Sequence, residues 1–268
     1  MKWARFTYQG RPRYGLLNGT AIQLTGHTWS DVLAGKPAKL EGELAQEEVT
    51  LLNPIGRPGK IVCVGLNYLD HCRETNTPPP EWPLLFTKFT TSINDPTGDI
   101  VWSGGLTREV DFEAELAVII GRHCRNVHED EALNFVAGYT AANDVSARDL
   151  QLGDGQWIRG KGLDTFCPLG PLFVTADEIP DPQKLAIRAI LNDQVMQDSN
   201  TKEMIFSVAR LIAFCSQAFT LEAGDVLLTG TPHGVGLGRD PQIYMQDGDV
   251  IVVEIEGIGR LENRCRVV

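Results

Sequence analysis

The chain has 268 residues, of which 43% are hydrophobic and 22% charged, as in one large globular domain or a large domain with a small appendage. Its formal net charge of -11 argues against nucleic acid as a partner, because phosphate would be repelled. Its six cysteines are scattered without a CxxC pair, which argues against a zinc ribbon or a disulfide framework. No apolar stretch has the length of a membrane span or of a signal region, so we expect a soluble, cytoplasmic protein that binds no membrane.

The first part of the chain, residues 1–57, predicts a small β-rich domain. Residues 3–8 alternate as in a strand, and Asn18-Gly19 lies between two apolar runs as in a hairpin. Residues 29–33 predict a short helix. Proline and glycine residues between positions 54 and 59 then indicate a linker.

The main domain is predicted to cover residues 58–268 and to begin with a buried strand at 60–65. Residues 66–74 predict one helical turn, which three prolines end, and a long irregular segment here is typical of a binding loop or lid. We expect a strand at 84–89, a helix at 129–136, an extended segment at 139–145 and short strands from 225 onward. Ser199 or Asn200 is expected to cap a helix that reaches Phe219. Strands outnumber helices, and the fold class is therefore α+β and β-rich.

The most informative stretch is 108–121, where acids alternate with apolar residues ahead of a β-branched run. The alternation predicts Asp111, Glu113 and Glu115 on one face of a strand, with neighbours roughly 7 Å apart. Carboxylates entering a buried strand need a partner, and a hard divalent ion would supply one. A solvated strand face is the alternative, and we prefer it for Glu254 and Glu256, which have the same spacing.

A third carboxylate could come from Asp144, which follows an apolar extended run. Three carboxylates on a magnesium-like ion leave coordination positions for water and substrate oxygens. The alternative is an Asx turn or helix cap at Asp144, with Arg148 and Asp149 as a surface pair.

His71 and Glu74 are three residues apart and would share one side of a helical turn. A carboxylate beside an imidazole raises its basicity and fixes its tautomer, which suits a general base for water. A solvated loop histidine next to an acid is the alternative. Cys72 projects in a different direction and is interpreted as structural.

Two glycine-rich segments carry further polar groups. Lys161 lies between two glycines and could reach a substrate carboxylate or an enolate, although such a lysine also serves solubility alone. The segment 229–238 lacks a following helix and contains Pro232, so we reject a dinucleotide-binding loop. Its backbone N–H groups and the Thr231 hydroxyl could still bind an anion.

Taken together, five segments in order resemble the fumarylacetoacetate hydrolase family, from about residue 60 to the C-terminus. They are Gly65-Leu66-Asn67-Tyr68 with His71 and Glu74, Asp111-Phe112-Glu113-Ala114-Glu115-Leu116-Ala117, Asn143-Asp144-Val145-Ser146-Ala147-Arg148-Asp149, Gly160-Lys161-Gly162 with Asp164-Thr165-Phe166, and Thr229-Gly230-Thr231-Pro232. Each segment alone is weak evidence for the family. The ordered set is specific for the family and much less so for the substrate.

The resemblance implies a rolled mixed β-sheet domain with a small N-terminal β-rich domain, usually in a homodimer. It also implies a site with three groups of residues: metal ligands for magnesium or manganese, a water-activating dyad on a lid, and groups at the enolate and the substrate. By residue-for-residue matching, the metal ligands would be Glu113, Glu115 and Asp144, and the dyad would be His71 with Glu74. Lys161 would stabilise the enolate, and Arg148, Gln151 and Thr231 would lie near the substrate.

One departure from the family bears on the substrate. Fumarylacetoacetase looks to have an additional acidic metal ligand upstream of its catalytic histidine, whereas Asp70 here is in the wrong register. The chain is more similar to the smaller bacterial members, which act on acylpyruvates, oxaloacetate or hydroxyheptadienedioate. We therefore expect a metal-dependent enzyme that cleaves a C–C bond of an acylpyruvate-type oxo acid by hydrolysis. The alternatives are oxaloacetate decarboxylation, 2-hydroxyhepta-2,4-diene-1,7-dioate isomerisation or decarboxylation, and a non-catalytic metal-dependent metabolite-binding protein.

Overall fold

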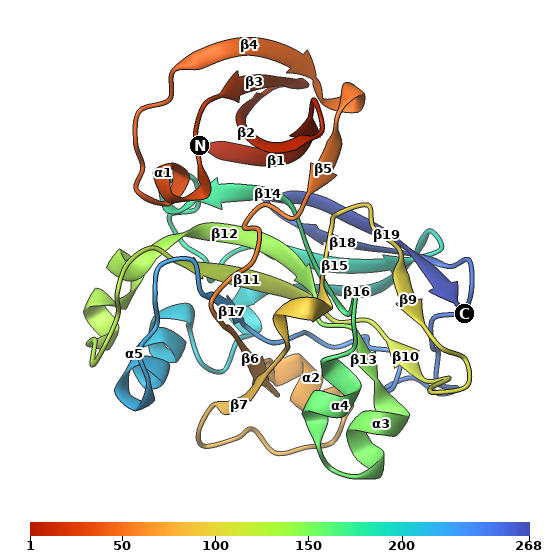
Figure 1. Ribbon diagram of the computed structural model, residues 1–268. Helices are drawn as coiled ribbons and strands as arrows, with labels where there is room; N and C mark the ends of the chain where they lie inside the picture. The colour runs from red at the N-terminus through yellow and green to blue at the C-terminus, as the bar shows by residue number, and fades with distance from the viewer.

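The computed structural model describes all 268 residues, and strands dominate it (Figure 1). The strands are β1 (Lys2–Tyr8), β2 (Arg11–Asn18), β3 (Ala21–Thr25), β4 (Leu40–Ala45), β5 (Thr50–Leu52), β6 (Ile61–Gly65), β7 (Leu84–Thr87), β8 (Ile93–Asn94), β9 (Ile100–Trp102), β10 (Val110–Asp111), β11 (Ala114–Ile120), β12 (Val136–Asn143), β13 (Ser146–Ala147), β14 (Cys167–Thr175), β15 (Ala186–Leu191), β16 (Gln194–Asn200), β17 (Val226–Leu228), β18 (Val250–Ile255) and β19 (Gly259–Val267). The helices are α1 (Trp29–Leu33), α2 (Leu69–Glu74), α3 (Arg148–Gly153), α4 (Trp157–Lys161) and α5 (Val208–Ala218). The predicted β-rich α+β class is confirmed.

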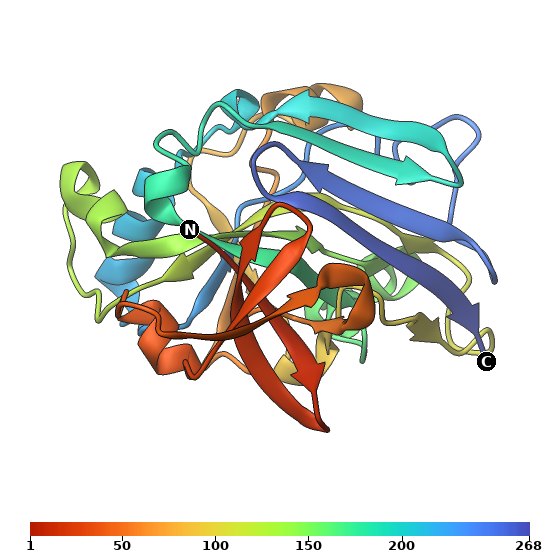
Figure 2. The ribbon, with the colours of Figure 1, turned by 90° about the horizontal axis from the view of Figure 1, so that it is seen from above.

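Two mixed sheets form most of the molecule. The larger sheet has 12 strands, with the order β4-β3-β2-β1-β14-β12-β11-β17-β6-β7, while β5 pairs with β1 and β8 with β14. The smaller has five strands in the order β16-β15-β18-β19-β9, and Figure 2 shows its two hairpins side by side. A short two-stranded ladder joins β10 to β13. Antiparallel pairs dominate, and the contacts β17–β6, β8–β14 and β19–β9 are parallel.

Strand β11 is buried on both of its faces, as its β-branched sequence predicts. Leu116 and Val118 belong to the larger core, which also holds side chains of β15, β18 and α5. Ala117 and Ile119 belong to a second core, on the other face, that includes Trp3 and other N-terminal side chains. Because β11 and its neighbours are fixed from both sides, polar groups at their ends are held rigidly.

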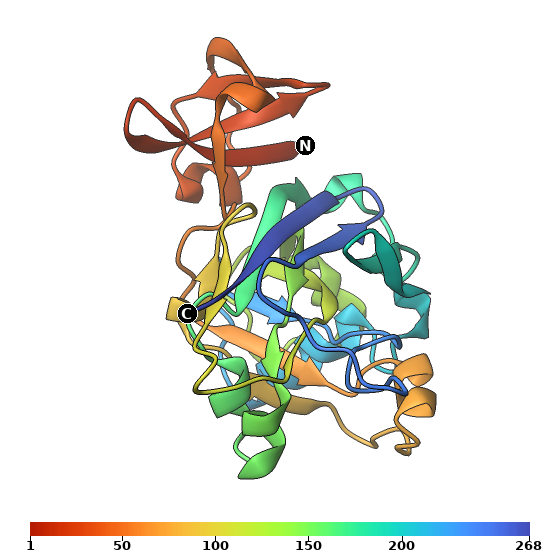
Figure 3. The same ribbon diagram turned by 90° about the vertical axis from the view of Figure 1, so that its right-hand side faces the viewer.

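The N-terminal strands β1–β5 gather at one end of the molecule, as Figure 3 shows. They are joined to the rest through backbone pairing, because Lys2 and Trp3 of β1 lie opposite Val174 and Phe173 of β14. That residues 1–57 form a separate domain stays a prediction. No helix in the structure combines the length and the apolar character needed to cross a membrane.

The structure differs from the predicted elements mainly around the longest helix. Ser199 and Asn200 end strand β16, and the helix begins only at Val208, where the Ser207 side chain accepts a hydrogen bond from the Arg210 N–H. Several turn-forming residues between 200 and 207 separate the strand from the helix, and apolar spacing alone does not show that break. The segment Glu129–Phe135 is a 3-10 helix, and the expected last residue, Val136, begins β12.

Candidate active site

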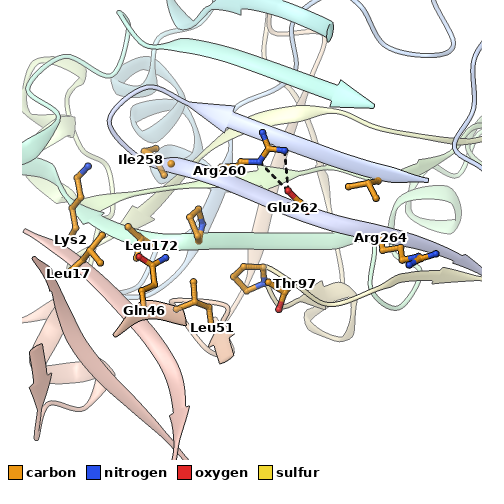
Figure 4. A pocket seen from close by; sticks show the side chains of 14 residues that line it. Lys2, Leu17, Gln46, Leu51, Thr97, Leu172, Ile258, Arg260, Glu262 and Arg264 are labelled. Carbon is orange, nitrogen blue, oxygen red and sulfur yellow. Dashed lines mark hydrogen bonds and ion pairs between the residues drawn. The ribbon is translucent and has the colours of Figure 1, made fainter. Parts of the chain in front are cut away.

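Two of the hollows in the protein differ in size and chemistry. The larger, a groove of about 760 Å³, lies between the N-terminal strands and β19 (Figure 4). Its only acid, Glu262, is paired with Arg260 at 3.1 Å, so the groove offers no cluster of reactive groups. The smaller cavity, of about 220 Å³, is lined by His71, Glu113 and Lys161, among others. It is the candidate active site.

Three carboxylates meet beside this cavity, from Glu113, Glu115 and Asp144. One ligand oxygen from each lies within 4.8 Å of the others. The antiparallel pairing of β11 with β12 explains the convergence, because Ala114 lies opposite Asn143 and the Asp144 N–H donates to the Glu113 carbonyl at 2.9 Å. The sequence interpretation that these acids form a solvated face, or that Asp144 caps a turn, is therefore wrong.

The three acids are buried in different electrostatic surroundings. Their exposed fractions are 6% for Glu113, 1% for Glu115 and 0% for Asp144. Burial would raise the pKa of Glu113, but Lys161 and Arg148 lower it to about 2. Burial, with Asp144 and Glu113 nearby, raises the pKa of Glu115 well above its ordinary value. Only the Gly230 N–H donates a hydrogen bond to Glu115, at 2.8 Å, so this carboxylate lacks a cationic partner.

The predicted place of Asp111 on the same strand face is wrong. The strand breaks after β10 ends at Asp111, and β11 begins only at Ala114. Asp111 instead accepts hydrogen bonds from the Arg148 Nε at 2.9 Å and from the Gly236 N–H at 2.7 Å. It serves to hold Arg148 and the 229–238 segment, and it is not part of the metal-competent group.

Three cations surround the acids. Lys161 Nζ lies 2.8 Å from both Glu113 Oε2 and Asp144 Oδ2. Burial alone would lower the pKa of Lys161, but these two acids outweigh it, and the pKa is raised overall. Lys161 is the last residue of the short helix α4, so the lysine between the two glycines lies at a helix end and not in a loop. Arg148 Nη2 lies 2.7 Å from Glu113 Oε1, so Arg148 and Asp149 are not a surface pair. Lys88 is fully buried and donates to Asp144 and to the Val145 carbonyl.

The predicted dyad lies on helix α2 at the cavity wall. His71 Nδ1 is 3.0 Å from Glu74 Oε2, as the three-residue spacing predicts, and His71 is only 8% exposed. Glu74 Oε1 also accepts the Gly234 N–H at 2.8 Å. Asp70 accepts the His71 N–H at 2.8 Å and lies 3.0 Å from the His233 Nδ1. Two carboxylates of α2 thus fasten the dyad to the 229–238 segment.

The 229–238 segment forms part of the cavity through Thr231. The Thr231 hydroxyl accepts a hydrogen bond from the Gln197 amide at 2.8 Å and is 5% exposed. Gly230 has a φ of +92°, and a Cβ there would lie 2.8 Å from the Asn67 Cβ, so only glycine can present its N–H to Glu115. Gln151, on α3, accepts from the Arg148 Nη1 at 3.0 Å and also lines the cavity.

The acid group fits a hard divalent cation by its chemistry. Mg²⁺ and Mn²⁺ prefer carboxylate oxygens, and the unpaired, buried charge of Glu115 is costly without a cation. Glu113, Glu115 and Asp144 would hold the ion. The structure therefore brings together every residue predicted for the site, and their roles stay predictions.

Sequence reasoning missed several residues that fix this geometry: Lys88, Asp111 as a partner of Arg148, Gln197, and the contact between Asp70 and His233. A lysine directly after the apolar strand residues 84–87 was a usable signal for Lys88, because buried lysines need an acid. The other contacts join segments far apart in the chain, and no local pattern reveals them.

Comparison with known proteins agrees with this geometry. Residues 60–266 match the family model described as fumarylacetoacetate (FAA) hydrolase C-terminal, and residues 1–54 match one described as Rv2993c-like, N-terminal. Oxaloacetate tautomerase FAHD2A, mitochondrial, of Bos taurus is 48% identical over 223 residues, which cover 82% of this chain and 71% of the relative. 2,4-Didehydro-3-deoxy-L-rhamnonate hydrolase of Sphingomonas sp. (strain SKA58) is 44% identical, with 97% of this chain and 94% of the relative covered.

A solved structure gives the same result for the fold. The fumarylacetoacetate hydrolase (EaFAH) from Exiguobacterium antarcticum superposes with a TM-score of 0.91 at 40% identity, and the match covers 100% of both chains. The relatives named here are enzymes, and the predicted rolled mixed β-fold is confirmed. The chain belongs to the fumarylacetoacetate hydrolase family and is an enzyme of that family.

Proposed function

We propose that the protein is a divalent-metal-dependent hydrolase that cleaves a C–C bond of an acylpyruvate-type 2,4-dioxo acid. One observation carries the proposal. His71, held 3.0 Å from Glu74, lines the same cavity as Glu113 and Lys161. A general base, an acid group suited to a cation and a lysine thus face one small space.

A divalent ion held by Glu113, Glu115 and Asp144 would supply Lewis-acid chemistry at the substrate's 2-oxo group, with Mg²⁺ or Mn²⁺ as the expected metal. The remaining side chains bind and orient the substrate. Arg148 and Gln151 approach from α3, and the Thr231 hydroxyl from the opposite segment. Because these groups are buried and hydrogen-bonded, they need little rearrangement during the reaction.

The dyad would perform the proton transfers. His71, oriented by Glu74, takes a proton from water, and the resulting hydroxide adds to the distal carbonyl carbon. The bond between that carbon and its neighbour then breaks, and its electron pair remains on the neighbour as a pyruvate enolate. Lys161 stabilises the enolate's negative charge, and the proton on His71 returns to the enolate carbon. The products are a carboxylic acid and pyruvate, so one water is consumed per bond broken.

Tautomerisation or decarboxylation of oxaloacetate is the second candidate. It is favoured by the 48% identity to a protein named oxaloacetate tautomerase. These reactions need an enolate and a base, but no attack by water. Isomerisation or decarboxylation of 2-hydroxyhepta-2,4-diene-1,7-dioate would also require only proton transfers at an enolate.

Proton NMR of the purified protein with acetylpyruvate and magnesium in heavy water distinguishes these reactions. Hydrolysis produces acetate and pyruvate at a rate well above a chelator control. Deuterium exchange at the carbon between the two carbonyls, without cleavage, would contradict hydrolysis of this substrate and favour an enolising enzyme. If neither rate exceeds the control, the metabolite-binding alternative gains support.

We also propose a homodimer, which rests on the family resemblance. Large apolar side chains such as Trp82 and Phe89 are 56% and 55% exposed in the single chain, as at many interfaces. Sedimentation equilibrium tests this proposal. A mass of one chain at micromolar concentration would contradict it.

A further inference from the structure

The active-site cavity has a charged part and an uncharged part. Its ionisable lining groups, His71, Glu113, Arg148 and Lys161, each contact an ionisable partner side chain. The rest of the lining consists of apolar side chains, hydroxyls, one glycine and the Gln151 amide, and none of it is ionisable. The uncharged lining includes Leu66, Phe86, Leu152, Trp157, Thr75 and Thr77.

The aromatic part of this lining consists of two rings that pack against each other. The rings of Phe86 and Trp157 meet edge to face with centroids 5.5 Å apart, and Lys161 Nζ lies 5.0 Å from the centroid of Phe86. A Cβ on Gly65 would lie 2.7 Å from the Trp157 ring, so glycine at this position lets the indole close the wall. An alkyl group placed here would be covered by apolar surface.

The hydroxyl part comes from the residues directly after helix α2. Thr75 Oγ1 donates to the His71 carbonyl at 3.0 Å and lies 3.1 Å from Thr77 Oγ1. A hydroxyl can accept a second hydrogen bond, so this pair can bind a hydroxyl of a substrate. Neither threonine can neutralise a carboxylate.

The charges beside the cavity match a substrate with one carboxylate. When all four carboxylates are ionised, as a bound cation would require, the buried groups carry one excess negative charge: four acids, Asp111, Glu113, Glu115 and Asp144, against three cations, Lys88, Arg148 and Lys161. A divalent ion would change this to one excess positive charge, and the carboxylate next to the 2-oxo group would neutralise it. A second carboxylate at the far end of the substrate would lose its water without gaining a cation.

We propose, resting on the proposed function, that the cavity selects 2-oxo acids whose distal group is uncharged, an alkyl or hydroxyalkyl chain, and rejects dicarboxylates. The cavity's 220 Å³ also suits a small substrate, since sites for drug-sized ligands hold about 300–1,000 Å³. Oxaloacetate and heptadienedioates are then poor ligands for this chain.

Isothermal titration of the full chain with Mg²⁺ present tests the proposal with 2-oxohexanoate and 2-oxoglutarate. These acids have a similar length, differ in the charge of the far end, and lack the 4-oxo group that hydrolysis needs. We expect 2-oxohexanoate to bind at least about tenfold more tightly, because 2-oxoglutarate buries an unpaired charge. Equal affinities, or tighter binding of 2-oxoglutarate, would overturn the proposal. Binding of oxalate without either oxo acid would do so too, because the cavity would then accept no distal chain.

A pair of variants separates the effect of a charge in the cavity wall from the effect of the protein's overall charge. Leu152 lines the cavity and is 58% exposed, so Leu152→Lys can bring an ammonium to the distal group; we expect it to improve 2-oxoglutarate binding at least about tenfold. Leu133 is 41% exposed and outside the cavity lining, and Leu133→Lys adds the same charge as a control. An equal gain in both variants would contradict selection by the cavity.

These titrations do not depend on turnover. If acetylpyruvate is not cleaved but 2-oxohexanoate is preferred, the hydrolase proposal fails and the selectivity proposal stands. If acetylpyruvate is cleaved and 2-oxoglutarate binds as well as 2-oxohexanoate, the hydrolase proposal stands and the selectivity proposal fails.

Discussion

Two pairs of glutamates with the same spacing differ completely in their surroundings. Glu113 immediately precedes β11 and Glu115 is its second residue; both are almost fully buried and face a third acid. Glu254, near the end of β18, pairs across the hairpin with Arg260 at 3.0 Å, and Glu256 is exposed. Alternation therefore places two acids on one face of a strand, and burial and neighbouring charges decide what that face can do.

The largest expected difference between the two pairs is in turnover after a carboxylate is replaced by an amide. We expect Glu113→Gln or Asp144→Asn to reduce magnesium-dependent turnover to the level of a chelator control, because each substitution removes a proposed ligand charge. Glu254→Gln should leave turnover unchanged, because Glu254 touches only a surface arginine. Steady-state kinetics with a magnesium titration measures both effects. Normal turnover in the Glu113 and Asp144 variants would refute the metal assignment.

The buried cations should matter for stability far more than surface cations do. Lys88→Met leaves Asp144 with one cation fewer in a fully buried place, and we expect a loss of about 3–5 kcal/mol in the free energy of unfolding. Urea denaturation of the metal-free protein measures it. Lys184→Met, which breaks the exposed pair with Asp181, is the control and should leave the midpoint unchanged. Similar midpoints for both variants would mean that the buried network contributes little.

The pH dependence of stability should distinguish Glu115 from exposed acids. Its pKa in the folded, metal-free protein is raised, first by burial and then by Asp144 and Glu113. The folded state therefore keeps a proton that the unfolded state loses at about pH 4.3. Stability then falls as pH rises from this value towards the raised pKa of the folded state. Because Gln mimics the protonated acid, we expect Glu115→Gln to remove this fall. Melting temperatures with chelator across pH 4–8 test it, with Glu256→Gln as the control that keeps the wild-type slope.

The smallest expected effect concerns the contacts that hold helix α2 to the 229–238 segment. His233→Ala removes the imidazole partner of Asp70, whereas the hydrogen bond from the Ser199 hydroxyl to Asp70, the dyad itself and the Glu74 contact to Gly234 remain. We expect a fall of only a few-fold, roughly two to five, in kcat/KM, because the dyad is less well positioned. Magnesium affinity should not change. The control, His128→Ala, lies in an exposed pair with Asp130, and an equal fall in that variant would contradict a positioning role.

Much of the fold and site could be predicted because the signals are local. The Asn18-Gly19 hairpin, the buried run of β11 and the three-residue spacing of His71 and Glu74 are all present in the structure. The break after Asp111 could not be predicted, because the pattern of alternation continues through it.

Contacts between residues far apart in the sequence could not be predicted either. The burial of Arg148 depends on Asp111, 37 residues away, and a charged residue in a polar sequence reads locally as exposed. The start of α5 was placed too early for a related reason. Its apolar spacing extends beyond the helix, since residues in the preceding turns are also drawn into the core.

Electron paramagnetic resonance of manganese binding tests the central claim most directly, because it counts bound ions without any assumption about substrate. We expect the wild type and Glu256→Gln to bind one Mn²⁺ per chain and Glu115→Gln to bind none at the same concentrations. Wild-type binding by Glu115→Gln, or no binding by the wild type, would contradict the assignment of the buried acids as a metal site.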